Sequence, residues 1–165
     1  MKILVLSDSH AGLIFMRRAI ATVKPDAIVH LGDFYDDAQD MADENPHIRF
    51  HMVPGNCDIG RIYRPVQETL CYDVCGVRLL MTHGHRHEVK KTLSLLLKDA
   101  RAGGAKAALY GHTHIPVCHR EEDGLWVLNP GACGSSGGSV GLIEVENKEI
   151  LRCKILRQAD LEVMK

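Results

Sequence analysis

The sequence predicts an α/β fold in which two mixed β-sheets pack against each other with helices on the outside. Three observations support this prediction. Short apolar runs alternate with amphipathic stretches in the first two thirds of the chain. Paired strand patterns surround turn dipeptides in the last third. The composition is ordinary for a globular protein, with 45% hydrophobic and 25% charged residues. Because 165 residues suit one hydrophobic core, we expect a single domain over 1–165.

Strands and helices alternate along the first two thirds. Short apolar runs predict buried strands, and apolar residues three or four positions apart predict helices. Pro25 and Pro46 lie just beyond two of these helices, and Gly103-Gly104 favours the end of a third. The expected elements are a strand over 2–6, a helix over 11–24, a strand over 26–31, a helix over 36–45, a strand over 48–53, paired strands over 69–75 and 77–82, a helix over 88–102 and a strand over 106–110.

The last third predicts antiparallel hairpins. The segments 116–120 and 125–128 flank Asp123-Gly124, and the segments 140–146 and 149–156 flank Asn147-Lys148. Apolar and charged residues alternate along the final strand, so one of its faces is expected to be buried.

Composition excludes several classes of protein. The 20 Lys and Arg residues against 21 Asp and Glu residues give a net charge of −1, without the basic excess that drives nucleic-acid or membrane-surface binding. No apolar run approaches the roughly 18 residues of a membrane helix, and no secretory signal is recognisable. The six cysteines are scattered without a Cys-x-x-Cys pair, which indicates free thiols and a cytoplasmic location.

Polar clusters follow five of the predicted strands. Because ligands bind at the carboxyl ends of strands in α/β sheets, these clusters are expected to share one crevice. Carboxylate, imidazole and amide donors together suit Mn, Fe, Ni or Zn. Seven ligands fit two ions if a carboxylate bridges them, and Asp33 is the central candidate. The seven predicted ligands are Asp8, His10, Asp33, Asn56, His83, His112 and His114.

These motifs, in this order, resemble those of the calcineurin-like metallophosphoesterase superfamily. The chain length, Gly55-Asn56-Cys57-Asp58 and Asn129-Pro130-Gly131 are similar to the small bacterial and archaeal phosphodiesterase family within it. The resemblance implies a four-layer αββα sandwich and two divalent ions, with Mn as first choice and Ni, Fe or Zn as alternatives. It implies that Asp8, His10 and His114 hold the first ion, that Asn56, His83 and His112 hold the second, and that Asp33 bridges them.

The resemblance also implies that a hydroxide shared by the two ions attacks phosphorus. Many superfamily members have a histidine after the Gly-Asn pair, which is thought to protonate the leaving group, but this chain has Cys57. A thiol with an ordinary pKa of about 8.5 is a poorer proton donor at neutral pH. We therefore expect a preference for good leaving groups or help from His85, with Asp58 orienting a ligand. Cys57, Asp58 and His85 are the predicted catalytic residues.

The charge of the site favours a small phosphodiester substrate. Two divalent ions, two carboxylates and one hydroxide leave about +1, which one phosphodiester neutralises. Neutralising a doubly charged monoester would require a further cation, and the candidates are Arg61, Arg64 and Arg86. A phosphomonoesterase, nucleotidase or nuclease on the same site remains an alternative. So does a protein-binding scaffold, because a retromer subunit shares the fold of these enzymes. A homodimer through apolar strands near the C-terminus is left open.

Outside the predicted site, plainer roles are expected. His30 lies in an apolar strand and is interpreted as a core histidine with a backbone partner. Asp36 and Asp37 are interpreted as acidic residues at a helix N-terminus rather than as ligands.

Overall fold

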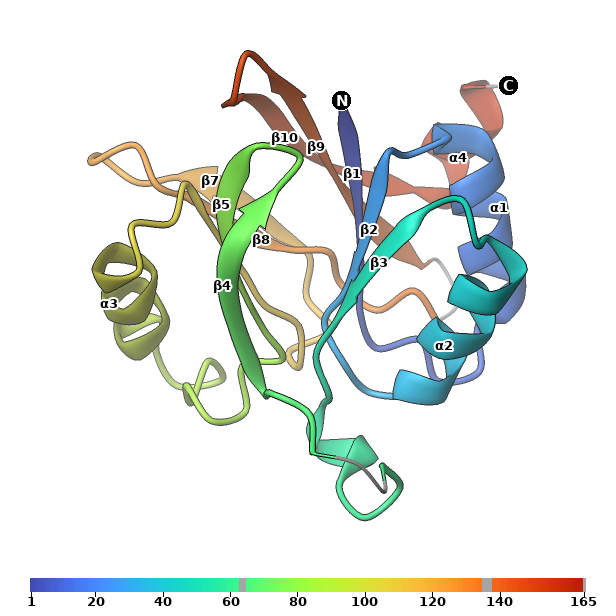
Figure 1. Cartoon of the computed structure of the whole chain (residues 1–165), viewed down its shortest axis with the longest axis horizontal. Coiled ribbons are helices and arrows are strands. Elements are labelled where there is room, and N and C mark those ends of the chain that lie inside the picture. Colours follow the sequence, from blue (N-terminus) through green and yellow to red (C-terminus); the bar gives the residue numbers. More distant parts are fainter. Residues whose placement is uncertain (63–64, 135–137, 165) are drawn as a thin grey trace.

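Two five-stranded sheets pack face to face between helices in the computed structural model, which describes residues 1–62, 65–134 and 138–164 (Figure 1). The strand order is β10-β9-β1-β2-β3 in the first sheet and β4-β5-β6-β8-β7 in the second. The elements are β1 (Lys2–Leu6), α1 (Leu13–Val23), β2 (Ala27–His30), α2 (Tyr35–Glu44), β3 (Arg49–Met52), the 3₁₀ turn η1 (Asn56–Asp58), β4 (Thr69–Val74), β5 (Val77–Thr82), α3 (Ser94–Ala102), β6 (Ala107–Leu109), β7 (Val117–Arg120), β8 (Trp126–Asn129), β9 (Ser139–Glu146), β10 (Glu149–Arg157) and α4 (Gln158–Val163).

Three apolar clusters hold four layers together. The largest lies between the sheets and includes Val5, Leu79 and Leu128, all fully buried. A second cluster lies between the first sheet and helices α1 and α4, and a third lies beneath α3 on the other sheet. Figure 1 shows α1, α2 and α4 on one side of the sandwich and α3 on the other. The predicted αββα architecture is confirmed.

The topology brings the ends of several strands to one edge. Strands β1, β2 and β3 are parallel neighbours in the first sheet, and β5, β6 and β8 are parallel neighbours in the second. The loops that follow β1, β2, β3, β5 and β6 contain the five polar clusters. Among the helices within the described ranges, none is both long and apolar enough to cross a bilayer.

The helix expected over 88–102 is the main error in the predicted elements, since α3 begins only at Ser94. Glu88 has a φ of 52°, which a right-handed helix does not allow, and residues 88–91 form turns. Val89 is buried, but it packs against Gly84 rather than on a helical face. The apolar residue at the start of the segment 88–102 therefore belongs to a buried turn and not to a helix. Helix α4 was not expected, because its six residues bury Leu161 alone.

The predicted hairpins are confirmed. β4 and β5 pair antiparallel through Cys75 and Gly76, whose φ angles are 51° and 84°. β9 and β10 pair through Asn147 and Lys148, at 51° and 64°. Two consecutive left-handed residues match the right-handed twist of the flanking strands.

His30 is a core histidine, as expected. It is fully buried, and its Nδ1 accepts a hydrogen bond from the Gly32 N–H at 3.3 Å. Asp36 and Asp37 lie in the first turn of α2.

Candidate metal centre

Four of the predicted ligands converge on a single point. Asp8, His10, Asp33 and His114 each offer one ligand atom, and these four atoms lie within 4.8 Å of one another. They come from the loops after β1, β2 and β6, which the topology brings to one edge. Two carboxylates facing two imidazoles at this spacing can surround one divalent ion.

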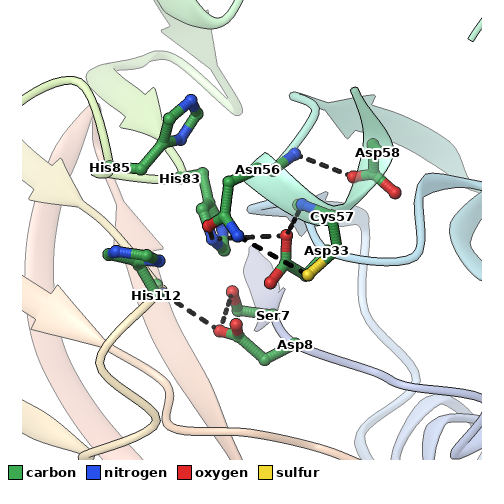
Figure 2. Close-up of polar contacts among 12 residues, drawn as sticks. Ser7, Asp8, Asp33, Asn56, Cys57, Asp58, His83, His85 and His112 are labelled. Carbon is green, nitrogen blue, oxygen red and sulfur yellow. Dashed lines mark hydrogen bonds and ion pairs between the residues drawn. The ribbon is translucent and has the colours of Figure 1, made fainter. Parts of the chain in front are cut away.

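Asp8 is held so that one oxygen remains available. The Ser7 hydroxyl donates to Asp8 Oδ2 at 2.6 Å and the His112 N–H donates to the same oxygen at 3.1 Å (Figure 2). The other oxygen, Oδ1, is buried without a hydrogen-bond donor and lies 3.0 Å from His114 Nε2. A buried carboxylate oxygen left without a donor costs free energy unless a cation neutralises it. The arrangement therefore fits a metal ion.

A second group of donors faces the first across Asp33. The Nδ1–H of His83 donates to the Leu31 carbonyl at 2.7 Å, which leaves the Nε2 lone pair of the neutral imidazole pointing into the site. This Nε2 lies 3.1 Å from Asn56 Oδ1 and 3.5 Å from Asp33 Oδ1. All three atoms offer lone pairs, and in the neutral state none has a proton to place between them. A cation between them would relieve this conflict.

His112 completes the second group. Its ring centre lies 5.0 Å from that of His83. Burial, followed by the nearby His83 and Lys90, lowers the pKa of His112 to about 4, so its imidazole is neutral at neutral pH. For Asp33, burial alone would raise the pKa, but the Cys57 N–H, which donates at 2.8 Å, and the nearby His83 outweigh burial and hold the pKa below its ordinary value. Neutral imidazole and ionised carboxylate are the forms that bind metals.

The backbone is strained at the same positions. Non-glycine residues seldom adopt positive φ, and such strain concentrates at functional sites. Two glycines also bring backbone close to the donors: a Cβ at Gly55 would lie 2.1 Å from Asp33 Oδ1, and one at Gly111 would lie 2.0 Å from Ser7 Oγ. Five of the seven predicted ligands have φ between 42° and 65°, namely Asp8, His10, Asp33, His112 and His114.

The three predicted catalytic residues lie around the second donor group, in different surroundings (Figure 2). Asp58 is buried, and its two oxygens accept the Tyr35 N–H at 2.9 Å and the Gly55 N–H at 2.8 Å. It is therefore placed to position the loop that carries Asn56. Burial, followed by the neighbouring Asp33, raises the pKa of the Cys57 thiol to about 11, which makes the thiol a weak acid.

His85 lies beside the second group. Its ring centre is 5.5 Å from that of His83 and 6.2 Å from that of His112. Both ring nitrogens are buried and without a hydrogen-bond partner, and Nε2 lies 3.7 Å from Glu68 Oε2. Burial, followed by the nearby His83, lowers its pKa.

Several side chains support the site through contacts that the sequence did not predict. Asn129 was visible in the Asn129-Pro130-Gly131 motif, but its hydrogen bonds were not expected. Asn129 donates from Nδ2 to the Gly111 carbonyl at 2.8 Å and to Thr113 Oγ1 at 3.0 Å, so it holds the turn between β6 and His114. Asp37 Oδ2 accepts the Ala11 N–H at 2.8 Å beside His10. Ser7 and Phe34 were also missed. A serine directly before the Asp8 motif was visible in the sequence, but nothing there indicated which group it would contact.

The fold and site together define a class of α/β sandwich proteins with a metal-binding centre at the carboxyl edge of both sheets. The profile for the calcineurin-like phosphoesterase superfamily domain matches residues 1–148. This chain belongs to that superfamily, and its relatives indicate the small prokaryotic metallophosphoesterases within it.

Three relatives illustrate the similarity. A probable metallophosphoesterase of Mycoplasma pneumoniae is 32% identical over 138 residues, covering 79% of this chain and 78% of its own. Phosphodiesterase MJ0936 of Methanocaldococcus jannaschii is 28% identical over 166 residues, covering 90% and 96%. The solved structure of Vps29 from Entamoeba histolytica, complexed with Zn²⁺, has a TM-score of 0.71 at 20% identity, covering 95% of this chain and 98% of that one. This last likeness concerns the fold alone.

Proposed function

We propose that this chain is a dinuclear metal-dependent phosphodiesterase that acts on small phosphodiesters as a single catalytic domain in the cytoplasm. The observation that carries the proposal is the arrangement of donors in two groups around Asp33, one with Asp8, His10 and His114 and the other with Asn56 and His83. A relative named as a phosphodiesterase supports the substrate class.

The residues of each group have defined tasks. Asp8, His10 and His114 would hold one divalent ion, Asn56, His83 and His112 would hold the other, and Asp33 would contact both. We take Mn²⁺ as the first candidate, because mixed oxygen and imidazole donors suit it. When bound, such a pair of ions supplies an activated water nucleophile and neutralises charge on the phosphoryl oxygens. Ser7 and the His112 N–H keep Asp8 oriented throughout.

The leaving group determines which diesters react. The raised pKa of the Cys57 thiol makes it a weak proton donor, and the lowered pKa of His85 leaves its imidazole mostly without a proton to donate near neutral pH in the metal-free chain. We therefore infer that esters whose leaving groups depart without protonation, such as nitrophenyl esters, react fastest.

Replacing the central carboxylate tests the proposal. Asp33→Asn removes the charge that would be shared by two ions and keeps the side-chain size. We expect metal bound per chain to fall from two towards one, and hydrolysis of bis(p-nitrophenyl) phosphate to fall by at least 10²-fold. Asp43→Asn, an exposed acidic residue in α2, is the matched control. Full diesterase activity in Asp33→Asn would contradict the bridging role.

A panel of mono- and diesters separates the alternatives. Faster hydrolysis of p-nitrophenyl phosphate than of its diester would favour a phosphomonoesterase. Metal binding without turnover of any ester would favour the alternative of a protein-binding scaffold.

A further inference from the structure

An arginine lies beside the predicted metal centre with an aromatic ring next to it. The guanidinium carbon of the exposed Arg61 is 5.2 Å from the centre of the Phe34 ring. The Phe34 ring meets the His10 ring edge-on, with 4.9 Å between ring centres. Phe34 therefore links Arg61 to a residue predicted to bind the first metal ion.

The backbone fixes the two partners relative to each other. Phe34 has a φ of 67° and follows Asp33, at 57°, so its direction is set by a strained turn. The Arg61 N–H donates to the Asp58 carbonyl at 3.0 Å, and the Asp58 carboxylate accepts the N–H of Tyr35, the residue after Phe34. Asp58 thus joins the segment that carries Arg61 to the segment that carries Phe34.

Arg61 differs from the other arginines considered for substrate binding. Within the described ranges, no ion pair joins its guanidinium to a carboxylate, whereas Arg86 Nε donates to Glu68 Oε2 at 2.9 Å. Arg64 lies outside the described residues. A guanidinium over an aromatic face keeps its N–H edge available for an oxyanion, and its planar fork matches phosphate.

We propose that Arg61, supported by Phe34, binds a second oxyanion of the substrate, beyond the phosphoester that is cleaved. This inference rests on the proposed function and narrows its substrate class to phosphodiesters that carry a further phosphate. Arg61 contacts the phenyl ring of Phe34, and no hydrogen bond or ion pair connects it to the predicted ligands within the described part of the chain. Because Phe34 contacts both Arg61 and His10, we assign the guanidinium to a substrate group beside the scissile phosphate rather than to that phosphate itself.

Equilibrium binding to the full chain with Mn²⁺ present tests the proposal without turnover. Thymidine 3′,5′-bisphosphate and thymidine 5′-monophosphate, compared by calorimetry, differ only in the second phosphate. We expect the bisphosphate to bind more tightly to the wild type. Arg61→Gln is expected to reduce that preference by about 10-fold, the size of one charge-assisted hydrogen bond. Arg61→Lys should keep part of it, and Arg86→Gln should keep all of it.

A kinetic comparison uses matched esters. The p-nitrophenyl ester of thymidine 5′-phosphate is hydrolysed with and without a 3′-phosphate, so the scissile bond is the same in both. We expect Arg61→Gln to lower kcat/KM for the bisphosphorylated ester alone.

Three outcomes would overturn the role of Arg61. Arg61→Gln could lose equal affinity for the bisphosphate and the monophosphate, or it could keep the wild-type preference for the bisphosphate. Alternatively, Arg86→Gln could reduce that preference as much as Arg61→Gln does. If the wild type hydrolyses neither ester, the phosphodiesterase proposal fails, while the calorimetric comparison still decides the role of Arg61.

Discussion

The buried His30 makes the stability of the fold depend on pH in a predictable direction. Burial, which outweighs the nearby Asp58, lowers the pKa of His30 from 6.5 to about 4. In the unfolded chain the imidazole is exposed and takes up a proton near pH 6.5. Between these two values the unfolded state binds more protons than the folded state, so acidification favours unfolding.

The magnitude follows from the difference between the two pKa values. At about 1.4 kcal/mol per pKa unit, the free energy of unfolding falls by about 3 kcal/mol as the pH is lowered from above 6.5 to about 4. In the wild type the Gly32 N–H donates to His30 Nδ1. His30→Asn removes the titrating group and keeps a hydrogen-bond acceptor near that N–H. We expect this variant to lose much less stability over the same range.

Urea unfolding between pH 7.5 and 4 measures this effect directly, with a chelator present so that metal binding does not contribute. The difference in unfolding free energy between wild type and His30→Asn should change by about 3 kcal/mol, in favour of the variant in acid. His47→Asn replaces an exposed histidine and should follow the wild-type curve. Parallel curves for wild type and His30→Asn would refute the reasoning.

Two further predictions concern the supports of the site. Asn129→Ala removes both hydrogen bonds that the side chain donates to the Gly111–Thr113 turn. Since each buried group left unpaired costs about 1–3 kcal/mol, we expect the free energy of unfolding, measured in urea, to fall by about 2 kcal/mol or more. A fall below about 0.5 kcal/mol would contradict this. Gly111→Ala places a Cβ 2.8 Å from Asp8 Oδ2 and is expected to weaken Mn²⁺ binding, measured by calorimetry. The double variant Ser7→Ala/Gly111→Ala lacks the nearest clash, so it should bind Mn²⁺ more tightly than the summed losses of the two single variants predict. A double variant whose loss of Mn²⁺ affinity equals or exceeds that sum would count against this explanation.

Sequence patterns were sufficient for most of the architecture. Strand runs, hairpin dipeptides and helix ends are local signals, because they depend on residues a few positions apart. The polar clusters that contain the seven predicted ligands stood out for the same reason, since each cluster follows an apolar strand. Parallel topology then brings those strand ends together, as it does in many α/β proteins. The late start of α3 escaped prediction because apolar spacing does not reveal the positive φ at Glu88.

Contacts between distant segments were decided by the tertiary structure alone. The sequence offered Arg61 and Arg86 as equivalent cations, but only the fold pairs Arg86 with Glu68 and sets Arg61 against Phe34. It likewise directs both oxygens of Asp58 to backbone amides. The physical reason is that residue type and local spacing determine which groups a loop presents, while the packing of the two sheets determines what those groups meet.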